Sequence, residues 1–245
     1  MTTPLTFSQY IDADYELFKD LLMESSGFDC DTNSKNKLTH SNVYKFKELF
    51  STITLNEDSQ NYYLESINGQ IEFFWLISLG KYKLASMALR GAMENFSQGL
   101  MHQFSMSPSK KFSENMDRSI KEVIESFCQQ KNLSPSIKKS FGKDFRTLFL
   151  DPFKNKYWDL CDIVHSRDTT FNSCREFLED VLKKQHNDDQ ADGLLELALE
   201  ISEYILVIFY YSNYSLITTQ LNHIKLDLIV SNFSSEFHKI KKYTI

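Results

Sequence analysis

Apolar residues recur every three or four positions along most of the chain, which is the spacing of one face of an α-helix. No segment shows the strict alternation of a half-buried strand. The pattern therefore predicts helices over residues 7–24, 40–53, 61–79, 81–104, 117–130, 136–150, 152–165, 176–185 and 188–223. Of these, the segment 81–104 has the clearest apolar face, formed by Ala85, Ala88, Leu89, Ala92, Phe96 and Leu100.

Glycine and proline suggest where several of these helices begin or end. Gly80 alone separates two long amphipathic segments, which indicates an αα-hairpin or one kinked helix. A capping residue precedes proline three times, and this predicts helix starts near residues 108, 135 and 152. Capping boxes predict two further starts, at Ser173 with Glu176 and at Asn187 with Gln190.

The composition supports few, long elements. The chain of 245 residues is 42% hydrophobic and 14% aromatic, but it has only 7 Gly and 4 Pro, too few turn formers for many short strands. We expect an all-α fold, a bundle of long antiparallel helices. The expected organisation is an N-terminal helical extension (1–60), the helical bundle (61–223) and a basic C-terminal tail (224–245).

The charge is unevenly distributed along the chain. A formal net charge of −6 argues against a general nucleic-acid coat protein. Residues 104–156, however, hold 11 Lys or Arg against 6 Asp or Glu. This basic segment is either a patch for an anionic partner such as RNA or an ordinary solvent-facing helix surface.

Cysteine spacing and hydropathy indicate a cytoplasmic location. The four cysteines lie far apart without a CxxC pair, so we expect reduced thiols rather than disulfides or a metal site. No secretion signal precedes residue 20. The apolar run 204–217 is too short to span a bilayer and is expected to be a buried helix. We expect no membrane association, no metal and no cofactor.

Arg90 and Glu94 form the first candidate pair for chemistry. They stand four residues apart on the face opposite the apolar stripe, yet Met87 and Met101 flank them on that face. This arrangement predicts that a second helix covers the pair. Arg90 could hold a phosphate with Glu94 as its orienter, or the two could simply form an ion pair on one helix.

His165 is the second candidate. It follows an apolar run at the end of a predicted helix, where the helix dipole and nearby carboxylates can tune an imidazole. Such a group could act as acid or base in phosphoester chemistry. The alternative is a structural histidine that caps the last carbonyl groups of the helix.

Two short motifs resemble those of HEPN-type proteins of prokaryotes, a superfamily of helical bundles. The first is A-x-x-x-L-R-x-x-x-E, here Ala85, Leu89, Arg90 and Glu94. The second is Y-x-x-L-x-x-x-V-H-S, here Tyr157, Leu160, Val164, His165 and Ser166. The resemblance covers about residues 61–220, and the superfamily is rich in toxin, abortive-infection and antiphage ribonucleases.

The resemblance implies a homodimer that cuts RNA without a metal. In active members a histidine assists attack by the ribose 2′-hydroxyl, and an arginine four to six residues before it steadies the phosphate. No arginine stands at that spacing before His165, so Arg90 or Arg167 would have to replace it. The expected site is then His165 as acid or base, Arg90 or Arg167 as phosphate holder, and Glu94 as orienter.

Two other functions are compatible with the same residues. In one, the chain is a catalytically inactive adaptor that binds a protein partner from the same operon, and Arg90, Glu94 and His165 form a buried polar network. In the other, the helices enclose a site for a small molecule or nucleotide.

Overall fold

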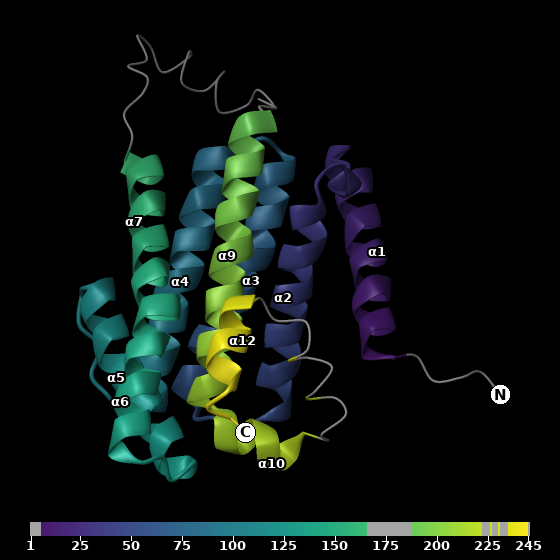
Figure 1. The fold of residues 1–245 in the computed structure, drawn as a ribbon. Coiled ribbons are helices and arrows are strands. Elements are labelled where there is room, and N and C mark those ends of the chain that lie inside the picture. The colour runs from purple at the N-terminus through teal and green to yellow at the C-terminus, as the bar shows by residue number, and fades with distance from the viewer. Residues whose placement is uncertain (1–5, 166–187, 222–225, 227–229, 231–234, 245) are drawn as a thin grey trace, which may run out of the picture.

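The computed structural model describes residues 6–165, 188–221, 226, 230 and 235–244, and these contain helices and no strand. The all-α prediction is therefore confirmed for this part of the chain. The longer helices pack side by side as a bundle (Figure 1). Their bounds are α1 (Phe7–Ser26), α2 (Ser34–Thr52), α3 (Glu57–Ser78), α4 (Tyr82–Gln103), α5 (Phe112–Gln130), α6 (Pro135–Phe145), α7 (Asp151–His165) and α9 (Asp188–Ser212). The shorter elements are η1 (Cys30–Thr32), η2 (Arg146–Leu150), α10 (Tyr214–Gln220) and α12 (Ser235–Lys241).

Helices α3 and α4 form the predicted hairpin around Gly80. Gly80 has φ +67°, a left-handed conformation that ends α3, and its amide donates to the Ile77 carbonyl at 2.9 Å. The two helices approach closely at Gly99, where an added Cβ would lie 2.7 Å from the ring of Tyr63. Glycine at this position therefore leaves room for the Tyr63 ring.

Helix α9 runs through the centre of the bundle, with α2 on one side and α4 and α7 on the other (Figure 1). Its second half is buried almost all round, as expected for the apolar run 204–217. The Phe209 ring of α9 lies 4.9 Å from that of Phe46 on α2 and 5.0 Å from that of Tyr63 on α3. Helix α2, placed in the predicted extension, thus shares the aromatic core with the bundle.

The start of α2 differs from the sequence prediction. The helix was expected from residue 40 after a loop, but it begins at Ser34. The cause is local, because the Asn33 side chain accepts a hydrogen bond at 3.0 Å from the Lys35 amide and so caps an earlier start.

The three proline signals had different outcomes. Pro135 opens α6 as predicted. The prediction at residue 108 is wrong, since α5 begins only at Phe112, after a loop in which the backbone of Ser109 hydrogen-bonds the side chain of Asn115 on α5. Pro152 lies in the first turn of α7, but no break precedes it. The π-turn η2 runs directly into α7, and such a widened turn tolerates the missing amide of a proline.

The long helix predicted over 188–223 divides at Asn213. Its side-chain amide donates to the Phe209 carbonyl at 3.1 Å and to Ser212 Oγ at 2.9 Å, and these bonds compete with the helical backbone pattern.

The Ser173 capping box lies outside the described residues. Within the predicted basic tail, α12 is helical and buries Phe237 against Tyr210 and Tyr211. Among the described helices, none has the length and apolarity to cross a membrane.

Candidate functional site

Arg90 and Glu94 lie on α4 as one hydrogen-bonded pair. Arg90 Nε donates to Glu94 Oε1 at 3.0 Å, the i,i+4 geometry expected on a helix. Their side chains are 27% and 41% exposed, so water reaches both. The two terminal nitrogens of Arg90 form no hydrogen bond with any described residue.

Helix α7 contacts the pair through Tyr157, although Met87, one of the two methionines that predicted a covering helix, is 49% exposed. The Tyr157 hydroxyl donates to Glu94 Oε1 at 2.7 Å, and the Arg90 guanidinium lies 5.6 Å from the centre of the Tyr157 ring. The Phe112 ring of α5 also stacks on the Tyr157 ring, with centroids 4.0 Å apart and an angle of 15° between the planes. We call Arg90, Glu94 and Tyr157 the α4–α7 polar cluster.

The pKa values of Arg90 and Tyr157 are both shifted by their surroundings in the cluster. Burial alone would lower the pKa of Arg90, but the hydrogen bond to Glu94 and the attraction of the nearby negative groups together outweigh it, and the pKa is raised. Burial, followed by the hydrogen bond to Glu94, raises the pKa of Tyr157. The cluster therefore contains a cationic arginine and a neutral tyrosine at neutral pH, and both donate to the same carboxylate oxygen.

His165 is the last residue of α7 and is exposed. It forms no hydrogen bond or ion pair with Arg90, Glu94 or any other described residue. It does share a side of α7 with Tyr157 and Cys161, since the three stand four residues apart in turn. Cys161 is close enough to interact electrostatically with Arg90, and His165 lies two turns, about 12 Å of helix rise, beyond Tyr157.

Arg167, the alternative phosphate holder, lies outside the described residues. The structure thus brings together Arg90 and Glu94 and adds Tyr157, while His165 lies two turns further along α7, without a hydrogen bond to them. The three cysteines in the described part of the chain, Cys30, Cys128 and Cys161, are buried free thiols. That part also holds no cluster of three or more His, Cys, Asp or Glu side chains suited to a metal ion.

Sequence reasoning missed two residues that the structure makes prominent. Tyr157 was noted only as part of a motif, because spacing along one helix cannot reveal a partner on another. Lys45 on α2 was not singled out. It is buried beside a cavity, and a lysine two residues from the equally charged Lys47 in a helical segment gives no signal of burial, even between Tyr44 and Phe46.

Replacing Tyr157 with phenylalanine is expected to lower the free energy of unfolding by about 1 kcal/mol. The change removes the donor to Glu94 and keeps the stacked ring, and the cost is modest because water can replace the lost hydrogen bond. Chemical denaturation measures it. The control is Tyr62→Phe on α3, whose hydroxyl has no hydrogen bond with a described residue. Equal stability losses in the two variants would contradict a stabilising role for the Tyr157 hydroxyl.

Comparisons of the chain with protein-family models, curated proteins and solved structures give no match. The HEPN resemblance therefore stays a prediction, and the function has to be argued from the site itself.

Proposed function

We propose that this chain is a HEPN-like helical protein of a bacterial conflict or antiphage defence system and that it acts on RNA as a metal-independent endoribonuclease. The observation that carries the proposal is the placement of Arg90 and Glu94 on α4 against the side of α7 that ends in His165. An arginine fork and an imidazole on neighbouring helices suit a phosphodiester and its attacking hydroxyl.

Arg90 is suited to hold the phosphate. Glu94 occupies only its Nε, which fixes the plane of the guanidinium, and the terminal nitrogens remain available for phosphate oxygens. Glu94 is itself held by Tyr157. In this role Glu94 and Tyr157 position Arg90 and need not touch the substrate.

His165 then acts from the C-terminal end of α7. As a base it takes the proton of the ribose 2′-hydroxyl, the oxygen attacks phosphorus, the bond to the 5′-oxygen breaks, and the 5′-oxygen takes up a proton from water. The products are a 2′,3′-cyclic phosphate and a free 5′-hydroxyl. The exposure of His165 leaves it accessible to an RNA strand. A homodimer, which the resemblance implies, would bring a second copy of this surface to the strand.

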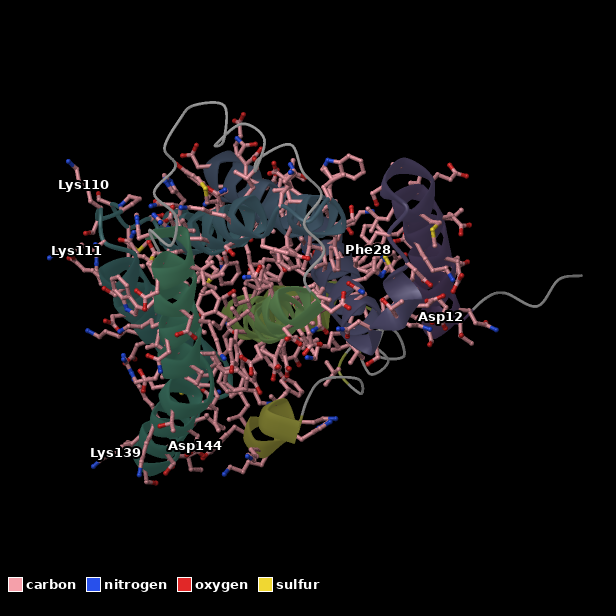
Figure 2. All side chains as sticks on the ribbon, turned by 90° about the horizontal axis from the view of Figure 1, so that it is seen from above. Asp12, Phe28, Lys110, Lys111, Lys139 and Asp144 are labelled. Carbon is pink, nitrogen blue, oxygen red and sulfur yellow. The ribbon has the colours of Figure 1, made fainter. Side chains whose placement is uncertain are left out.

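The basic segment supports an anionic partner. Figure 2 shows Lys110, Lys111 and Lys139 pointing outward from the side of the bundle formed by α5, α6 and α7. None of their ammonium groups forms an ion pair with a described residue, so their charge is available to a phosphate backbone.

The test is cleavage of a 5′-labelled single-stranded RNA by the purified chain in excess EDTA. We expect fragments that end in a 2′,3′-cyclic phosphate, loss of cleavage in His165→Ala and in Arg90→Met, and normal cleavage in His238→Ala. His238 is a matched control because it is an exposed histidine on α12, outside the proposed site. Intact RNA with the wild-type chain, or cleavage by His165→Ala at the wild-type rate, would remove the proposed activity.

A second candidate is a catalytically inactive adaptor for a protein partner. It is favoured by the mutual hydrogen bonding of the α4–α7 polar cluster, which joins two helices without any substrate, and by Trp158 beside it, which is 54% exposed. Light scattering of the chain with and without the products of neighbouring genes tests this role. A complex that forms with the wild type and fails with Trp158→Ala supports it, and a chain that scatters identically in every mixture rejects it.

A further inference from the structure

A cavity of about 620 Å³ lies at the junction of α1, α2 and α9, away from the α4–α7 polar cluster. Figure 1 shows α2 between the other two helices. Each helix turns one face to the cavity: Ile11 and Tyr15 come from α1, Leu38 and Lys45 from α2, and Leu199 from α9. A volume of this size suits a small organic molecule.

Lys45 is the unusual member of this lining. Its side chain is only 3% exposed, and its ammonium forms no hydrogen bond or ion pair with any described residue. The nearest influence of opposite charge is Glu203 of α9, which attracts the ammonium electrostatically without a hydrogen bond to it. A buried ammonium normally has acceptors around it, because burial without them is costly. The cavity is therefore the place from which an acceptor can come.

The other charges around the cavity are already paired. Asp12 forms an ion pair with Lys37 at 2.8 Å, and Asp31 forms one with Lys19 at 2.8 Å. Lys45 thus contributes a single positive charge to the interior. A single ammonium matches a ligand group with one negative charge best.

We propose that this cavity binds a small organic monocarboxylate. Its carboxylate accepts a hydrogen bond from Lys45 Nζ, and its apolar body lies against Ile11, Leu38 and Leu199. The Ser41 hydroxyl, one helical turn before Lys45 and also in the cavity wall, is placed to donate to the second carboxylate oxygen. This site is independent of any RNA chemistry at the α4–α7 polar cluster.

The experiment is isothermal titration of the full chain with octanoate, 1-octanol and octyl phosphate, which share a tail and differ in head group. We expect one octanoate site, with affinity at least about tenfold above that for 1-octanol, since a charge-assisted hydrogen bond is involved. Octyl phosphate should bind more weakly than octanoate. In Lys45→Met the advantage of octanoate over 1-octanol should disappear.

Two controls keep the result interpretable. Lys47→Met changes an exposed lysine on the same helix and should leave the octanoate affinity unchanged. Thermal unfolding of Lys45→Met checks that the fold is retained, and methionine fills nearly the same volume as lysine. Equal affinities of octanoate and 1-octanol for the wild type, or unchanged octanoate binding in Lys45→Met, would overturn the proposal. Tighter binding of octyl phosphate would reject the monocarboxylate.

Discussion

Replacing Phe46 with alanine is expected to lower the free energy of unfolding by about 3–5 kcal/mol, the cost of deleting a fully buried aromatic ring. The Phe46 ring is buried completely and packs edge-on against Phe209, Tyr63 and Phe96, at centroid distances of 4.9, 6.2 and 6.0 Å. Three helices therefore surround the cavity that the substitution would leave, and they can close it only in part.

Chemical denaturation of the full chain measures this effect, with Leu17→Ala as the control. Leu17 is on α1 and is mostly exposed, so its truncation should change stability by less than about 0.5 kcal/mol. The comparison also reports on the role of the first sixty residues. A small loss in Phe46→Ala, similar to that of Leu17→Ala, would show that α2 adds little to the stability of the bundle.

Replacing Lys45 with methionine is expected to raise the free energy of unfolding by about 3 kcal/mol at pH 7, and this gain should vanish near pH 10.5. Burial lowers the pKa of Lys45 from 10.5 to about 8, against which the attraction of Glu203 acts only in part. Below pH 8 both the folded and the unfolded chain carry the proton, so the folded state bears the full cost of the buried charge.

The sign of the pH dependence follows from proton binding. Between pH 8 and pH 10.5 the folded chain has released the Lys45 proton and the unfolded chain still holds it, so the stability of the wild type rises with pH relative to the variant. Urea unfolding of the wild type and of Lys45→Met at pH 7 and pH 10 measures the gap between their free energies of unfolding. Other titrating groups contribute equally to both chains and cancel in this difference. Lys47→Met should show no such gap. A gap of the same size at both pH values would contradict the buried-charge explanation.

A stabilising effect of Lys45→Met would bear on function as well. A residue that weakens the fold while facing a cavity is commonly retained for what it binds. Stability and octanoate affinity should then change in opposite directions in this single variant, which a purely structural lysine would not produce.

Several features of the fold could be predicted from local sequence. The stripe Ala85 to Leu100 defined α4 and its buried face, Gly80 defined the turn before it, and Pro135 defined the start of α6. The boundary errors also have local causes. Asn33 and Asn213 act through their own side-chain hydrogen bonds, which start α2 early and divide the last long helix. Pro108 carries the same signal as Pro135 without starting a helix.

The sequence by itself determined that the chain is helical and that Arg90 and Glu94 can pair, because both depend on residues within a turn or two of each other. Only the tertiary structure decided that Tyr157 completes that pair, that His165 ends α7 exposed and without a hydrogen bond to it, and that Lys45 is buried. These three features depend on which helices pack together and on how far the helices are shifted along one another. A periodic pattern gives each helix an apolar face, but it does not specify the partner that covers the remaining faces.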